Sequence, residues 1–237
     1  MSGHARDLDQ LTAFALKRTC GSEFDAGHSR RVPARAKRLC PIDCRIDDGL
    51  AALTRADTSK GKPMATSLYD LSVPTFLQTV SAVAGFLDRA AKHCAETGAD
   101  PDDFVHARLF DDMAPFHFQI EALAHHSVWG LEAVKNGVFA PPALIGPIPF
   151  ADLRTMITRA ETALEAFTPD EVNGWADKDL DFQIGPRRLA FTPETFILSF
   201  SLPNFHFHAV TAYNILRTRG VPLGKRDYEG RLRTSPP

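Results

Sequence analysis

The stretch FILSFSLPNFHFHAVTAYNILRTRG, residues 196–220, decides how the rest of this sequence is interpreted. At 100° per residue its apolar side chains fall on one stripe, as in an amphipathic helix that packs against a core. Asn204 and His208 lie on this stripe four residues apart, whereas His206 points the opposite way. The stretch therefore predicts a helix that carries a polar pair on its buried face.

Two interpretations of this polar pair are open from the residues alone. Pro203 removes an N–H in mid-helix and leaves the carbonyl of Ser199 without its usual donor, so the amide of Asn204 could repair the kink. His208 could be a metal ligand or a proton-transfer group, because imidazole titrates near neutral pH. The alternative is a buried histidine that is hydrogen-bonded to Asn204, to Gln119 or to a backbone carbonyl.

Three more long helices precede this stretch, each with apolar residues at helical spacing: residues 73–97 with Ser72 as the cap, residues 115–136, and residues 150–167. A proline-rich connection, residues 138–149, separates the second and third helices. Residues 180–184 and 188–191 alternate around Gly185-Pro186, as in a small β-hairpin. The sequence predicts an all-α protein, an antiparallel four-helix bundle with a small β-hairpin before the fourth helix.

The second of these helices also carries polar residues near its apolar stripe. Gln119 and His117 fall at the two edges of the stripe, where a side chain can reach the interior. His125 and His126 are predicted to lie at the surface, and adjacent helical residues diverge by 100°, so this doublet is not expected to share one ion.

Composition excludes several classes of function. Among 237 residues, 44% are hydrophobic and 24% are charged, which is ordinary for a soluble globular protein. No apolar run reaches the roughly 18 residues that a membrane span needs, and the N-terminus lacks a secretory signal, which favours a cytoplasmic protein. Residues 64–237 contain 15 basic and 21 acidic side chains, so nucleic acid is not expected as a partner.

Residues 1–63 differ from the remainder, with 12 basic and 8 acidic side chains and two aromatic residues. Organised patterning begins at Met64. We expect a domain at residues 64–237, preceded by a segment that is disordered or that reflects a misassigned start, with Met64 as the initiator. A basic tail is the alternative, and the acidic residues argue against a transit peptide.

Three segments carry a resemblance to a known family: MATSLYDLSVPTF at residues 64–76, RLFDDMAPFHFQI at 108–120 and LPNFHFHAVTAYNILRTRGVPLGKRDYEG at 202–230. Together they resemble an uncharacterised branch, a domain of unknown function, of the DinB/YfiT-like helical-bundle superfamily. The resemblance implies three metal-binding histidines, one on the second helix and two on the fourth. His208 matches one of these positions, Asn204 falls on the second, and Gln119 falls near the third, with His117 as the nearby imidazole.

The resemblance and the polar residues together suggest a pocket between the second and fourth helices. Gln119, Asn204 and His208 are expected to bind a small molecule there, or His208 and His117 a divalent metal such as zinc, nickel or iron. Neutral amides bind such ions poorly, so the metal pattern is incomplete. The alternative is a non-catalytic homodimer whose polar cluster only sets helix register. The residues do not decide whether the protein is an enzyme.

The predicted domain boundary can be tested by shortening the chain. A chain that begins at Met64 should unfold at the same temperature as the full chain, because little in residues 1–63 can join a core. Differential scanning calorimetry of both chains measures this. A clear fall in the unfolding temperature would contradict the boundary.

Overall fold

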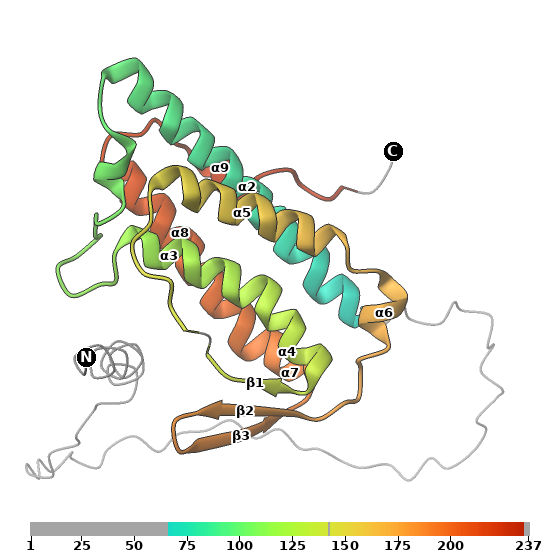
Figure 1. Cartoon of the computed structure of the whole chain (residues 1–237). Helices are drawn as coiled ribbons and strands as arrows, with labels where there is room; N and C mark the ends of the chain where they lie inside the picture. The colour runs from blue at the N-terminus through green and yellow to red at the C-terminus, as the bar shows by residue number, and fades with distance from the viewer. Residues whose placement is uncertain (1–65, 142, 235–237) are drawn as a thin grey trace, which may run out of the picture. The chain divides into compact units, whose positions relative to one another are not determined.

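The computed structural model describes residues 66–141 and 143–234, which form a mostly helical domain with a small sheet at one end (Figure 1). The extension predicted at residues 1–63 lies outside the described residues. In the part of the chain that the structure describes, none of the helices combines the length and the apolar character that crossing a membrane would require.

The first helix, α2 (Leu68–Thr97), begins one turn earlier than the sequence predicted. Its cap is Ser67, whose Oγ accepts a hydrogen bond from the Asp70 N–H at 3.1 Å in a capping box. The predicted cap, Ser72, is instead buried inside the helix and donates to the Leu68 carbonyl. Gly98, with φ 73°, ends the helix in the left-handed conformation.

The second helical segment follows the short 3₁₀ helix η1 (Pro101–Phe104) and consists of three pieces. These are α3 (Phe116–Ala124), the π-helical turn η2 (His125–Trp129) and α4 (Gly130–Asn136). The pieces together confirm the predicted helix at residues 115–136, and Gly137 ends it in the left-handed conformation. The π turn, which is a frequent feature of functional sites, was not predicted.

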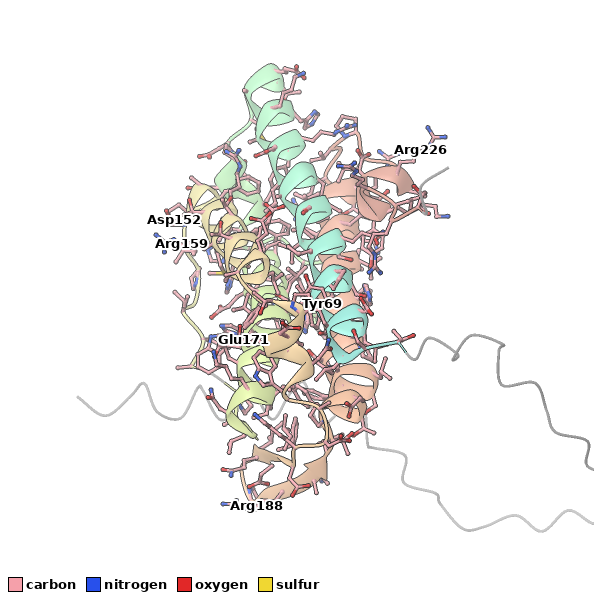
Figure 2. The ribbon with its side chains drawn as sticks, turned by 90° about the vertical axis from the view of Figure 1, so that its right-hand side faces the viewer. Tyr69, Asp152, Arg159, Glu171, Arg188 and Arg226 are labelled. Atoms are coloured by element: carbon pink, nitrogen blue, oxygen red, sulfur yellow. The ribbon has the colours of Figure 1, made fainter. Side chains whose placement is uncertain are left out.

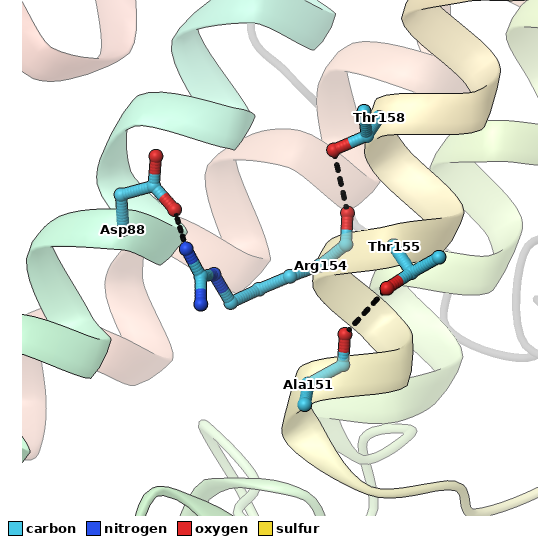
Figure 3. Close-up of polar contacts among 5 residues, drawn as sticks. All are labelled: Asp88, Ala151, Arg154, Thr155 and Thr158. Carbon is cyan, nitrogen blue, oxygen red and sulfur yellow. Dashed lines mark hydrogen bonds and ion pairs between the residues drawn. The ribbon is translucent and has the colours of Figure 1, made fainter.

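The third long helix is α5 (Phe150–Glu165), and the short helix α6 (Pro169–Asn173) follows it with Thr168 as its cap. On α5 the hydroxyl groups of Thr155 and Thr158 donate to the carbonyls of Ala151 and Arg154, four residues back (Figure 3). Arg154 also pairs with Asp88 of α2 (Figure 3). This exposed ion pair contributes about 0–1 kcal/mol, so packing of α5 on α2 depends mainly on apolar burial.

The predicted hairpin is confirmed as β2 (Leu180–Ile184) and β3 (Arg187–Phe191), which pair antiparallel with Leu180 opposite Phe191. A third strand, β1 (Val138–Phe139), pairs parallel with β2. The sequence predicts these two residues to be part of the proline-rich connection. A strand of two residues has no alternation to detect, and it forms because β2 supplies a partner.

The fourth helical segment is capped by Thr192 and consists of α7 (Pro193–Phe196), the π turn η3 (Ile197–Ser201) and α8 (Leu202–Thr218). In η3 the N–H of Leu202 donates to the carbonyl of Ile197, five residues back. Pro203 follows immediately. The chain therefore reaches its mid-segment proline through a widened turn, without a break between η3 and α8.

Helix α3 packs against α8 on one side and α5 on another, and α2 packs against α5 and α8 (Figure 1). The side chains between them form one core that includes large aromatic groups: Phe76, Phe86, Phe116, Phe150, Phe196 and Phe205. Figure 2 shows charged side chains such as Asp152, Arg159 and Arg226 on the outside of the same helices.

The C-terminal segment is docked on α2, although the sequence indicated only a polar tail. It forms the short helix α9 (Lys225–Glu229), and the Glu229 carbonyl accepts a hydrogen bond from Gln78 Nε2 at 3.0 Å. Asp227 pairs with Arg89 at 3.1 Å. Gly230 then lies against α2 with φ 64° and ψ −148°, a combination that essentially only glycine adopts.

Gly230→Ala should release this segment. The added Cβ would lie 3.0 Å from Ala82 Cβ and 3.1 Å from the Gln78 carbonyl, in a backbone conformation that alanine avoids. We expect the free energy of unfolding to fall by about 1–3 kcal/mol in urea titrations. Gly224→Ala is the matched control, because its Cβ would meet nothing closer than 3.8 Å. Equal effects of the two substitutions would contradict this role of Gly230.

Candidate functional site

A hydrogen bond between α3 and α8 forms the centre of the candidate site. His208 of α8 is 8% exposed, and its Nδ1 lies 2.8 Å from Oε1 of Gln119 on α3, which is 1% exposed. Both residues were predicted to line an interior site, and the structure brings them together. The bond crosses the seam between the two helices, where apolar side chains surround it.

The second polar atom of Gln119 fixes the tautomer of His208. Gln119 Nε2 donates to the Ala114 carbonyl at 2.9 Å, and a carbonyl oxygen can only accept. The amide oxygen of Gln119 therefore faces His208, and Nδ1 of His208 must carry the hydrogen. A neutral His208 then has its lone pair on Nε2, which is free to accept a hydrogen bond.

His126 of η2 stacks on His208, with ring centroids 5.7 Å apart and planes inclined by 14°. Its ring also packs against Phe139 and Phe200. Nδ1 of His126 is buried, and it has no hydrogen-bond partner among the described residues. His126 is half-buried and its Nδ1 points into the protein, so the prediction that it lies at the surface is wrong.

Helix packing explains this error. Gln119 and His126 are seven residues apart, almost two full turns, so they lie on the same side of their helix. The apolar spacing of residues 115–136 predicts a single buried stripe. Because α3 and η2 both pack against α5 and α8, the buried arc of this segment is wider than that stripe. The seven-residue spacing from Gln119 was the signal that could have identified His126.

Burial keeps both imidazoles neutral. Desolvation lowers the pKa of His208 to about 4 and, together with the neighbouring His208 and His125, the pKa of His126 to about 3. The seam is therefore uncharged at neutral pH. It offers hydrogen-bonding nitrogen atoms surrounded by aromatic rings, because Phe118 and Phe207 also pack against His208.

Asn204 is half-buried, and its Nδ2 donates to the Phe200 carbonyl at 2.7 Å. This arrangement agrees with the kink-repair interpretation, except that the carbonyl belongs to Phe200 and not to Ser199. No hydrogen bond joins Asn204 to His208 in the described residues. Its predicted role in ligand binding stays a prediction.

His117 lies in a different cluster from His208. Its ring packs against that of His106 at 6.0 Å, and its Nδ1 is buried with no partner in the part of the chain that is described. Burial, then the nearby His106 and Arg108, lower the pKa of His117. The structure thus brings together Gln119, His126 and His208, and it places His117 elsewhere.

The metal-ligand set implied by the resemblance does not fit these residues. Gln119 uses both of its polar groups within the protein, and the amide nitrogen of Asn204 is bound to Phe200. Among the described residues, no group of three histidine, cysteine, aspartate or glutamate side chains could hold a metal ion. Only His208 of the three positions presents an imidazole.

The helical segments and their small sheet define a DinB-like protein. The chain is similar to the crystal structure of a DinB family member protein from Shewanella denitrificans, with 27% sequence identity and a TM-score of 0.61. The match covers 72% of this chain and 96% of that one. No curated protein matches the chain. The family model described as Domain of unknown function (DUF1993) matches residues 68–229, and the chain belongs to this family.

The neutral histidines predict that acid destabilises the fold. Unfolded histidine has a pKa of about 6.5, so between about pH 6 and pH 4 the unfolded chain binds more protons than the folded one. As the pH is lowered through this range, the free energy of unfolding should decrease by up to about 1.4 kcal/mol per pH unit for each buried histidine. Urea titrations at several pH values measure this slope.

His126→Phe should make this slope shallower, because it removes one of the two imidazoles of the seam. The variant should take up about one proton fewer on unfolding in this pH range. An unaltered slope in His126→Phe would show that His126 is not held neutral by burial.

Proposed function

We propose that this protein binds a small molecule at the seam between α3–η2 and α8, within an antiparallel four-helix bundle. His126 and His208 supply the polar contacts, and Gln119 positions His208. The proposal does not include the three-histidine metal centre, because two of those positions carry amides that are engaged within the fold.

The observation that carries the proposal is Nδ1 of His126, which is buried without a partner among the described residues, in a ring that stacks on that of His208. A buried polar atom without a partner costs about 1–3 kcal/mol. A phenyl ring in the same place, between Phe139 and Phe200, would avoid this cost. An imidazole that lowers stability at a buried position is typical of a binding residue.

The chemistry of the site indicates what kind of molecule it would bind. Nε2 of His208 accepts a hydrogen bond, so the ligand should present a hydroxyl or an amine hydrogen. The surrounding rings of Phe118, Phe139 and Phe200 favour an apolar or aromatic body. A neutral phenol or aryl alcohol combines these properties, and the neutral imidazoles disfavour a strongly charged ligand.

A second candidate is the non-catalytic homodimer. The hydrogen bond from His208 to Gln119 links α3 to α8 across the core, and that bond could serve only to fix their register. On the outer face of α8, Phe207 is 53% exposed and Val210 is 37% exposed, which supports an apolar contact with another protein surface.

His126→Phe separates the two candidates. If His126 is a binding residue, the variant should be more stable by about 1 kcal/mol but should lose binding of phenol or benzyl alcohol. Binding is measured by shifts of ¹³C-labelled histidine ring signals, with toluene and anisole as probes that lack a hydroxyl hydrogen. Unchanged phenol binding in His126→Phe, or no binding to the wild-type protein, would refute the proposal.

Metal analysis of protein purified without an affinity tag gives an independent check. The proposal expects no stoichiometric zinc, nickel or iron. Bound metal that disappears in His208→Ala while the protein remains folded would establish the metal-binding alternative. If His208→Ala unfolds the protein, the same comparison is made with His126→Phe.

A further inference from the structure

A second buried polar cluster lies on another side of α3, beneath the connection formed by residues 143–149. Its central residue is Glu121, which is 1% exposed. Glu121 is two residues from Gln119, so its side chain points about 200° away from the His208 seam. The two clusters therefore use different faces of the same helix.

One carboxylate oxygen of Glu121 is bound, and the other is not. Oε1 accepts a hydrogen bond from the Ile145 N–H at 2.5 Å, and the backbone of Gly146 also donates to the carboxylate. Oε2 is buried with no partner in the described residues. A buried carboxylate is normally paired with a cation, because its desolvation costs several kcal/mol.

No basic side chain of the described residues supplies this charge. Burial raises the pKa of Glu121, and only the N–H groups of Ile145 and Gly146 oppose that effect. Arg108, which influences His117, donates its guanidinium hydrogen to the Met113 carbonyl. Oε2 of Glu121 therefore has neither a hydrogen-bond donor nor a cationic partner among the described residues.

His117 supplies a second acceptor on the same face. It precedes Glu121 by four residues, about one turn, which brings their side chains within about 6 Å at Cβ. Its Nδ1 is buried and lacks a partner among the described residues, and its lowered pKa keeps the ring neutral. A neutral imidazole beside a carboxylate favours a ligand with several hydrogen-bond donors and a positive charge.

A hollow of about 320 Å³ lies next to this cluster. It is lined by Asp102, Val105, His106, Pro147, Ile148 and Pro149. His106 contacts the ring of His117, and Pro147 directly follows the two residues whose N–H groups hold Glu121. The hollow is thus bounded by residues that adjoin His117 and the backbone groups that hold Glu121.

We propose that Glu121 and His117 form a binding site for a primary ammonium group, which enters from this hollow beneath residues 145–149. An ammonium group has three donors and one positive charge. One N–H donates to Oε2 of Glu121 and a second to Nδ1 of His117. The site is separate from the His126–His208 seam and does not depend on the function proposed for it.

Methylammonium chloride and tetramethylammonium chloride are the probes, compared at equal ionic strength. Both carry one positive charge, but only methylammonium has N–H donors. We expect methylammonium to raise the unfolding temperature of the full chain saturably and to shift the ¹³C signal of the Glu121 carboxyl group. Equal effects of the two salts, or no saturable effect of methylammonium, would overturn the proposal.

Glu121→Gln keeps the shape of the side chain and removes its charge, so it should weaken methylammonium binding by at least about tenfold. If that variant does not fold, His117→Phe is used and should weaken binding similarly. His126→Phe is the control and should bind methylammonium as the wild type does. Undiminished binding in the folded Glu121 or His117 variant refutes the site, whatever the outcome at the His126–His208 seam.

Discussion

The hydrogen bond between His208 and Gln119 is the interaction on which the interior of this protein depends. It joins α3 to α8 within an apolar core, and the Ala114 carbonyl fixes the orientation of the Gln119 amide. Because both partners are almost fully buried, loss of either one would leave the other without a substitute partner in water. The same bond sets the tautomer of His208 and so decides which nitrogen atom can accept a ligand.

Two π turns bring a second imidazole to this bond. Ser201, at the end of η3, donates to the carbonyl of His126 in η2. Gly130, directly after η2, leaves room for this approach, since a Cβ there would lie 2.7 Å from Ser201 Oγ. The close contact of the two turns places the ring of His126 on that of His208, and it concentrates aromatic rings from β1, β2 and η3 around them.

The long helical segments and the hairpin could be predicted because each is specified locally. Helical spacing of apolar residues, a capping serine or threonine and a terminal glycine act within a few residues of one another. The errors arose where a local signal was duplicated or absent. Ser67 and Ser72 both precede apolar residues, and only the capping box with Asp70 distinguishes them. Strand β1 has two residues and exists only through its pairing with β2.

The sequence by itself determined the helices, the sheet hairpin, the kinship with DinB-like proteins and the inward direction of Gln119 and His208. Helical periodicity gives these directions relative to one helix. Tertiary structure decided which faces meet: η2 packs against both α5 and α8, which buries Nδ1 of His126, and residues 145–146 cross over Glu121 and hold its carboxylate. The path of a proline-rich connection leaves no periodic trace in the sequence, because its contacts depend on where the distant helices place its two ends.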